Sequence, residues 1–218
     1  MADTKENYNE ADNSEVEAAP QGDLVIPRPC PICGVTINGK AALVEIPHFK
    51  EVAHLTLDCG NCGNKTESYK SGHRVEDKGT KMTLKMESKR DFERLVLKGE
   101  HCTMEIPSLG LEVPPEALPA RYMSIADFLH QTLTDVLRHA QATGRGGNSD
   151  LKQWVQKMMA FMDGDMLPAT LILTDPAGNT YLESFSAPEK DATIETEEYE
   201  RSVADNKRVN ASYDSPFA

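Results

Sequence analysis

Two pairs of cysteines constrain this chain of 218 residues more than any other feature of its sequence. The pairs are Cys30-Pro31-Ile32-Cys33 and Cys59-Gly60-Asn61-Cys62, and a glycine follows each pair. Two intervening residues let both sulfurs of a pair turn toward one ion, and the glycines let backbone amides point at sulfur. Four thiolates fill the tetrahedral shell of Zn²⁺ and leave no position for water. The pattern therefore predicts one structural zinc held by Cys30, Cys33, Cys59 and Cys62.

The alternative interpretation is a redox C-x-x-C site or two unrelated cysteine pairs. A thioredoxin-like site needs one pair in a βαβ setting, whereas both pairs here lie among short apolar-alternating stretches. The sequence opens without a basic segment followed by an apolar one, so we expect a reducing compartment in which cysteines bind metal. The fifth cysteine, Cys102, is expected to be a small buried residue in a strand.

Negative charge is concentrated toward the two ends. The chain has 23 basic and 35 acidic residues, a net charge of −12 at pH 7. Seven of the acids and a single lysine fall in residues 1–24, which predicts a disordered acidic leader. An acidic chain is disfavoured from binding phosphate backbones and anionic membranes. No stretch of it has the roughly 18 successive apolar residues of a membrane span. We therefore expect no membrane contact and no nucleic acid.

A zinc-ribbon module that binds nucleic acid or serves transcription is nevertheless the alternative function. Zinc ribbons of that class use basic side chains to contact phosphates. The basic residues near the second cysteine pair are Lys65, Lys70, His73, Arg74, Lys78 and Lys81. A strong negative salt dependence of binding would favour this alternative.

Hydrophobic periodicity changes from strand-like to helical at residue 124. Before it, apolar residues alternate with polar ones and glycines mark turns, which predicts short antiparallel strands. Ser124 and Asp127 form a capping box, and apolar residues then recur at helical spacing. A glycine-rich turn over 143–148 leads into a second helix with Trp154 and methionines on one face, which we expect to be core. These features predict a helical hairpin at about 124–163.

Strand patterns return at 169–174 and 180–185, and we interpret them as a hairpin about the turn Asp175–Asn179. A further strand is expected after Pro188. The fold class predicted is therefore mostly β with an inserted α-helical hairpin, an α+β protein. We divide it into a leader (1–24), a four-cysteine zinc ribbon (25–70), a β scaffold (71–204) and a disordered tail (205–218).

The sequence carries no familiar catalytic motif. A phosphate-binding loop, a serine nucleophile elbow, a zinc-protease helix and a dinucleotide fingerprint are all missing from it. A metal-dependent hydrolase would need an open coordination position, which four thiolates deny. We therefore predict a non-enzymatic protein.

Several blocks of sequence resemble the ZPR zinc-finger family over roughly residues 28–201. They are CPICG (30–34), VEIPHFKEV (44–52), CGNCG (59–63), YKSG (69–72), GTKMTL (79–84), CTMEIPSL (102–109), MSIADFL (123–129) and DPAGNTYLES (175–184). The resemblance implies a zinc ribbon followed by a double-stranded β-helix that a helical hairpin interrupts. Eukaryotic members usually carry two such modules in tandem. This chain resembles one module, and its IPHFKEV wording is closer to the second.

The resemblance also implies a function. It implies binding to translation elongation factor one-alpha, assistance in its folding or biogenesis, association with growth-factor receptor tyrosine kinase tails, and a cytoplasmic and nuclear location. The metal role falls on the four cysteines. Beyond the last strand, the sequence ADNKRVNASYDSPFA (204–218) departs from the family's acidic tail, so contacts made by that tail do not carry over.

Candidate partner contacts lie in two of the resembling blocks. We take them to be His48, Phe49, Lys50, Asp175, Asn179 and Tyr181. For Asp175 and Asn179 the alternative is turn chemistry alone, since aspartate, proline and glycine are typical of tight turns.

Overall fold

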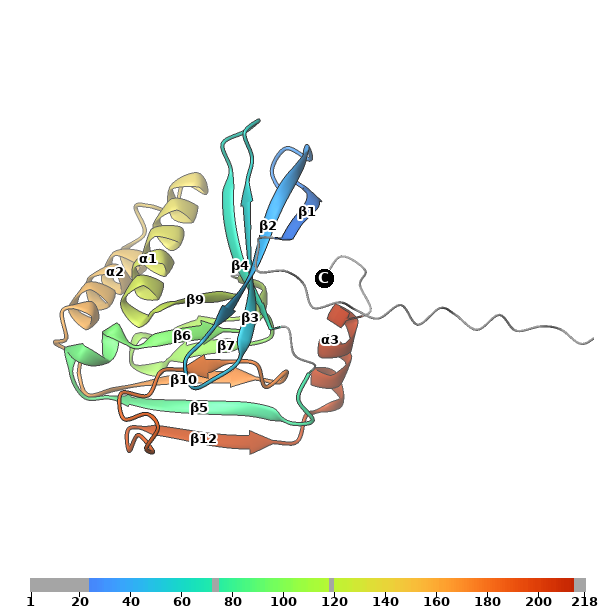
Figure 1. Ribbon diagram of the computed structural model, residues 1–218. Helices are drawn as coiled ribbons and strands as arrows, with labels where there is room; N and C mark the ends of the chain where they lie inside the picture. The colour runs from blue at the N-terminus through green and yellow to red at the C-terminus, as the bar shows by residue number, and fades with distance from the viewer. Residues whose placement is uncertain (1–23, 72–74, 118–119, 214–218) are drawn as a thin grey trace, which may run out of the picture.

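The computed structural model describes residues 24–71, 75–117 and 120–213 (Figure 1). The predicted leader therefore lies outside the described residues except for Leu24, and so do His73 and Arg74. None of the helices in the described ranges is long and apolar enough to cross a bilayer.

The N-terminal unit is an antiparallel ribbon in which successive strands are neighbours, in the order β1-β2-β3-β4. Its strands are β1 (Leu24–Pro29), β2 (Thr36–Glu45), β3 (Glu51–Asp58) and β4 (Lys65–Ser71). Both cysteine pairs lie in turns at one end of the ribbon, and the β2–β3 turn lies at the other end, against the rest of the molecule (Figure 1). The elongated hairpin explains the long separation between the two cysteine pairs.

The second unit is a jelly roll made of two sheets that share one core. One sheet has the order β12-β5-β10-β7-β8 and the other has the order β11-β6-β9. The strands are β5 (Gly79–Met86), β6 (Leu95–Lys98), β7 (Thr103–Ile106), β8 (Leu111–Val113), β9 (Arg121–Ser124), β10 (Ala169–Asp175), β11 (Tyr181–Leu182) and β12 (Ile194–Tyr199). Short 3-10 helices, η1 (Lys89–Glu93), η2 (Pro107–Leu109) and η3 (Pro115–Ala117), lie between them. The predicted fold class, a four-cysteine ribbon followed by a double-stranded β-helix, is confirmed.

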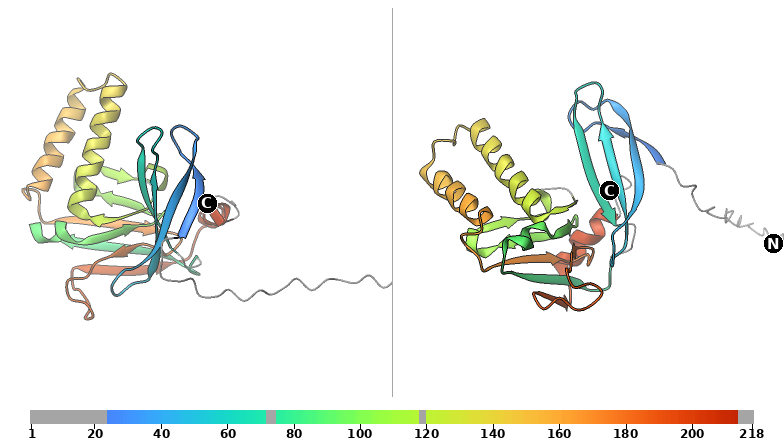
Figure 2. Two further views of the ribbon diagram at one scale, coloured as in Figure 1. Left: turned by 45° about the horizontal axis from the view of Figure 1, so that its top comes forward. Right: turned by 60° about the vertical axis from the view of Figure 1, so that its left-hand side comes forward.

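Helices α1 (Ile125–Ala142) and α2 (Ser149–Met162) are inserted between β9 and β10. As the capping box predicts, the Ser124 hydroxyl accepts a hydrogen bond from the Asp127 amide at 3.0 Å. Phe128, Met158 and Phe161 are buried in the jelly-roll core, so both helices contribute their apolar faces to that core. The hairpin and the ribbon project from the same side of the jelly roll (Figure 2).

The predicted disordered tail (205–218) is wrong for residues 205–213, and residues 214–218 lie outside the described residues. The C-terminal segment forms α3 (Val203–Tyr213), which lies at one end of the jelly roll (Figure 1). The helix begins with a capping interaction in which the Asp205 amide donates to the Ser202 hydroxyl, at 3.1 Å. Val209 is buried, which fixes the helix to the domain. Its polar composition concealed it, although Ser202 and Asp205 repeat the cap signal of α1.

The predicted hairpin of β10 with β11 is wrong. β10 pairs with β5 and β7 in one sheet, whereas β11 pairs with β6 in the other. The turn over 175–179 therefore carries the chain from one sheet to the facing sheet, as the closed jelly-roll core requires. Turn chemistry marks where a chain reverses but leaves the partner of each strand open.

A buried ion network fastens η1 to the loop before β12. Arg94 donates to Asp91 at 2.9 Å and to Asp191 at 2.8 Å, and it also donates to the Glu183 carbonyl and the Thr193 hydroxyl. The side chains of Arg94, Asp91 and Asp191 are each less than a tenth exposed. This network holds together segments that lie about ninety residues apart in the sequence.

Candidate metal centre

The two cysteine turns have nearly the same backbone structure. The Gly34 amide donates to the Cys30 carbonyl at 2.9 Å, and the Gly63 amide donates to the Cys59 carbonyl at 2.8 Å. Both glycines have φ of +72°, a left-handed conformation that strongly favours glycine. The sequence thus folds each pair into a knuckle whose two sulfurs face the other pair.

The four cysteine sulfurs lie within 4.8 Å of one another. The Sγ atoms of Cys30 and Cys62 are 3.6 Å apart, as are those of Cys33 and Cys59. In a tetrahedral site with zinc–sulfur bonds of about 2.3 Å, neighbouring sulfurs stand about 3.8 Å apart. Cys30 and Cys59 are buried and the second cysteine of each pair lies nearer the surface.

Electrostatics of the cluster favour a bound cation. Donation from Asn61 and the Val35 amide lowers the pKa of the Cys33 thiol to about 6. The Asn64 amide also lowers the pKa of Cys62, but desolvation and the neighbouring cysteine sulfurs outweigh it and raise that pKa to about 12. Four thiolates cannot ionise together at this spacing unless positive charge compensates them.

The donor set therefore fits one structural Zn²⁺. Sulfur ligands in C-x-x-C knuckles at tetrahedral spacing are the typical structural zinc site of a ribbon. Four protein ligands complete the shell, so such a site offers no position for a substrate. The cation would link the β1–β2 turn to the β3–β4 turn.

Most of the candidate contacts around the β2–β3 turn meet the chain's own jelly roll. The Phe49 ring lies 5.0 Å from the Tyr181 ring, and the Tyr181 hydroxyl donates to the Pro47 carbonyl at 3.2 Å. Lys50 forms an ion pair with Glu76. His48 stays exposed, with a φ of +61°.

An apolar interface supports these contacts. Ile46 and Val52 of the ribbon and Leu97 of β6 form its buried centre, and Tyr69 and Tyr122 pack beside them. The Tyr69 amide donates to the Ala120 carbonyl at 3.2 Å. The end of the ribbon opposite the cysteines is therefore fixed to the jelly roll.

Asp175 and Asn179 are buried, which corrects their assignment as partner contacts. The Asp175 carboxylate accepts hydrogen bonds from the amides of Ala177 and Asn179, each at 2.9 Å. Burial raises the pKa of Asp175, and these amides oppose that effect. Turn chemistry, the alternative interpretation, accounts for the Asp175 carboxylate and the Asn179 amide. Cys102 is buried as expected, and burial raises its thiol pKa to about 12.

The ribbon exposes apolar side chains that sequence reasoning did not single out. Ile32 is 72% exposed and Leu43 is 71% exposed. Five of the eight large apolar side chains exposed in the described ranges belong to the ribbon; they are Leu24, Val25, Ile32, Val35 and Leu43. We call these five residues the ribbon surface. Leu43 could have been found, because alternation along β2 puts it on the same face as Ala41 and Glu45.

Comparison with known families gives two matches that follow each other along the chain. Residues 24–77 match the ZPR1 zinc-finger domain, and residues 90–211 match the ZPR1 jelly-roll domain. The stretch between the two matches, residues 78–89, contains β5, the first strand of the jelly roll.

Individual relatives agree with these matches. The mouse zinc finger protein ZPR1 is 35% identical over 184 residues, which cover 83% of this chain and 40% of that protein. The fruit fly protein of the same name is 38% identical over 84% of this chain and 41% of its own length. The fission yeast zinc finger chaperone zpr1 is 32% identical over 95% of this chain and 47% of its own length. The chain thus spans less than half the length of these relatives.

Proposed function

This chain belongs to the ZPR1 family of zinc-finger chaperones, and from that premise we propose that it binds translation elongation factor one-alpha and assists its folding or biogenesis. It does so as an interaction protein without catalytic activity. We also propose that association with receptor tyrosine kinase tails and a cytoplasmic and nuclear location, both implied by the family resemblance, extend to this chain.

The ribbon surface is the observation that carries the proposal. Large apolar side chains that one element leaves in water mark it as a candidate contact surface for another molecule. Here the exposed side chains lie on β1, on β2 and in the turn between them, in a ribbon that packs on the jelly roll at one end and carries the cysteine knuckles at the other. A rigid apolar surface suits a client that exposes hydrophobic segments while it folds.

We assign the metal to Cys30, Cys33, Cys59 and Cys62, with a structural role. In this proposal the ribbon (25–70) and the β scaffold (71–204) act together, and the hairpin at about 124–163 provides a second projection beside the ribbon (Figure 2). The chain's net charge of −12 suits a basic client, and such attraction weakens with salt.

Nucleic-acid binding is the less favoured function, because nearby acids pair with three of the basic residues near the cysteines. Lys65 pairs with Asp58 at 2.7 Å and Lys70 pairs with Glu100 at 3.6 Å. Lys78 lies within 4 Å of carboxylates of both Glu198 and Glu200. Lysines paired in this way offer little free charge to phosphates.

The test is a binding titration of the zinc-loaded chain against purified elongation factor one-alpha at low and moderate salt. We expect binding at low salt, and we expect Ile32→Asp and Leu43→Asp each to weaken it about tenfold or more. Val203→Asp is the matched control, since Val203 is 87% exposed but lies on α3. Absence of binding by the wild-type chain at low salt, or an equal loss in the control, would overturn the proposal.

A further inference from the structure

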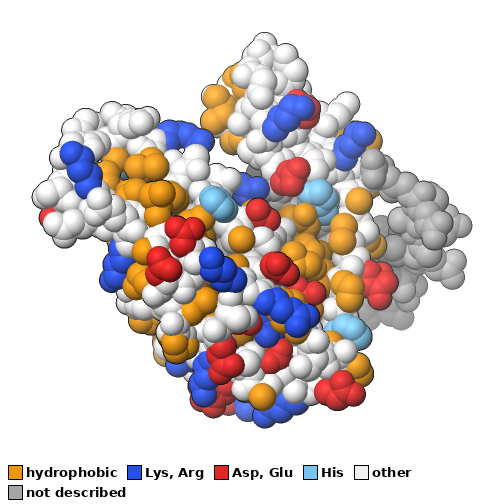
Figure 3. All heavy atoms as spheres, turned by 90° about the vertical axis from the view of Figure 1, so that its left-hand side faces the viewer, with side chains coloured by type: hydrophobic (Ala, Val, Ile, Leu, Met, Phe, Trp, Pro, Cys, Tyr) orange, Lys and Arg blue, Asp and Glu red, His pale blue; other side chains and the backbone are white. Residues whose placement is uncertain are grey.

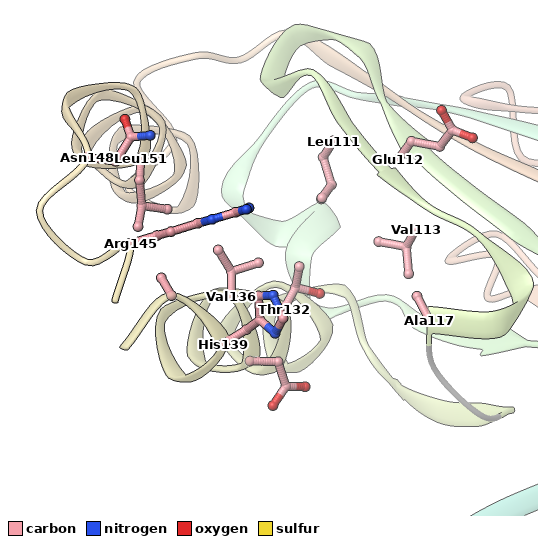
Figure 4. Close-up of a pocket in the computed structure, with 12 residues that line it drawn as sticks. Leu111, Glu112, Val113, Ala117, Thr132, Val136, His139, Arg145, Asn148 and Leu151 are labelled. Atoms are coloured by element: carbon pink, nitrogen blue, oxygen red, sulfur yellow. The ribbon is translucent and has the colours of Figure 1, made fainter. Parts of the chain in front are cut away.

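A groove with a volume of about 700 Å³ lies between α1 and the strand β8, and the loop joining α1 to α2 also lines it (Figure 4). Its walls are largely apolar; they include Leu111, Val113, Ala117, Val136, Ala140 and Leu151. In Figure 3 apolar side chains gather on the lobe formed by the hairpin, beside the notch that separates it from the ribbon. A groove of this size with apolar walls is typical of ligand sites.

Three polar side chains enter the same groove. Thr132 is 7% exposed, and its hydroxyl has no hydrogen-bond partner among the described residues. Arg145 projects into the groove from the hairpin loop, and within the described part of the chain it forms no ion pair (Figure 4). His139 lines the groove beside them. The buried Thr132 hydroxyl loses free energy unless a ligand supplies its partner, and the exposed Arg145 guanidinium is available to pair with an anionic group of that ligand.

The acidic side chains at the groove do not neutralise this arginine. Glu112 points away from the groove (Figure 4). Asp135 accepts hydrogen bonds from Arg138 at 2.9 Å and from Gln131 at 3.0 Å. The charge left facing the groove is therefore positive, which calls for a carboxylate in the occupant.

One wall of the groove is a free sheet edge. β8 is the last strand of its sheet and pairs only with β7 among the described strands. Its outer backbone groups can therefore pair with one more strand, which is how many domains bind extended peptides. β8 covers only Leu111–Val113, so the added strand would be short.

We propose that this groove binds a short extended segment of a partner protein in which an aliphatic residue adjoins an aspartate or glutamate. The segment pairs with β8 and places its aliphatic side chain between Leu111 and Val136. Its carboxylate meets Arg145, and one of its polar groups reaches the Thr132 hydroxyl. The site is separate from the ribbon surface, which carries the elongation-factor proposal.

The test is selection of a phage-displayed library of random heptapeptides on the zinc-loaded full chain. Selected peptides are then synthesised with a fluorophore and titrated by fluorescence polarisation. We expect enriched sequences to combine aliphatic and acidic residues. Arg145→Glu and Ala117→Trp should each weaken these peptides at least tenfold; the second variant fills the groove from an exposed position.

Lys152→Glu is the matched control, because Lys152 is exposed on α2 and does not line the groove. It should change affinity less than twofold, and the melting temperatures of all three variants should stay near that of the wild type. The proposal is overturned if no peptide depends on Arg145 and Ala117, or if the enriched sequences are basic. Binding of decanoate in the groove without binding of any peptide would also overturn it, since the occupant would then be a free fatty acid.

Discussion

Asp191→Asn removes one charge from the buried network around Arg94. Burial by itself would raise the pKa of Asp191. Hydrogen bonds from the hydroxyl and amide of Thr193 and from the Arg94 guanidinium have the larger combined effect and lower this pKa to about 2. The ordinary value is 3.8. Each unit of pKa difference corresponds to about 1.4 kcal/mol, so the charged form of Asp191 contributes about 2–3 kcal/mol to stability at pH 7.

Asp191→Asn should lower the free energy of unfolding by about this contribution and not by the larger amount that an unpaired buried charge costs. Leaving a buried charge without any partner costs about 3–5 kcal/mol. Arg94 keeps its bond to Asp91 at 2.9 Å in the variant, and asparagine retains one oxygen that can accept from Thr193. The expected loss in the free energy of unfolding is therefore about 2–3 kcal/mol at pH 7.

The pH dependence follows from the direction of the shift. Because folding lowers the pKa, the wild-type contribution is fully present above pH 3.8 and is lost as the pH falls through about 2. Asparagine does not titrate, so the difference between wild type and variant should shrink over that range. Acid also releases zinc from both proteins, and the comparison cancels that effect.

Urea unfolding followed by the fluorescence of Trp154, the single tryptophan, measures this difference in the jelly-roll core. Asp135→Asn is the matched control, since Asp135 pairs with Arg138 at 2.9 Å on the surface, where the arginine is 70% exposed. The control should lose less than about 1 kcal/mol. Equal losses in the two variants, or a deficit for Asp191→Asn that persists unchanged at pH 2, would refute the reasoning.

Three further predictions address the ribbon, its attachment and the buried turn. Cys59→Ser should release zinc and unfold the ribbon while the tryptophan signal of the jelly roll persists; a variant with stoichiometric zinc by elemental analysis and an unchanged melting temperature would contradict it. Phe49→Ala should reduce the free energy of unfolding by about 1–2 kcal/mol and speed proteolysis between the units, because the ring contact to Tyr181 is lost; unchanged cleavage rates would argue against the interface. Gly178→Ala should lower stability by about 1–3 kcal/mol in thermal unfolding, since its Cβ would lie 2.8 Å from that of Glu76. Gly144 has a similar φ of +69° but open space around the position of a Cβ, so Gly144→Ala should lose less stability than Gly178→Ala.

Local signals explain what the sequence predicted well. Each knuckle is built within a few residues, because the C-x-x-C spacing and the following glycine determine the backbone that points sulfur at a metal. The helical hairpin was equally predictable from the sequence, since Ser124 marks its start and apolar spacing marks its buried face. In both cases the residues that determine the structure are neighbours in sequence.

Long-range contacts explain the features that the sequence did not predict. The partner of β10 depends on closure of the whole jelly roll, which no turn motif encodes. Asp175 looked exposed because aspartate is common in surface turns, but here the turn connects two facing sheets and the carboxylate serves backbone amides inside the core. Phe49 and Tyr181 were recognised as contact residues, yet only the folded chain shows that they contact each other.

The two ends of the ribbon have complementary roles. Thiolates at one end suit a metal that closes the knuckles. At the other end the Phe49 ring packs against Tyr181, whose hydroxyl donates to the Pro47 carbonyl. Antiparallel hairpins are marginally stable by themselves. A ribbon that is held at both ends is already ordered, so it loses less conformational entropy when a client binds than a free hairpin would. The ribbon can therefore stay folded while Ile32 and Leu43 are exposed, because its stability does not come from burying these two side chains. This arrangement explains how a unit with little core of its own can present apolar side chains to another protein and remain folded.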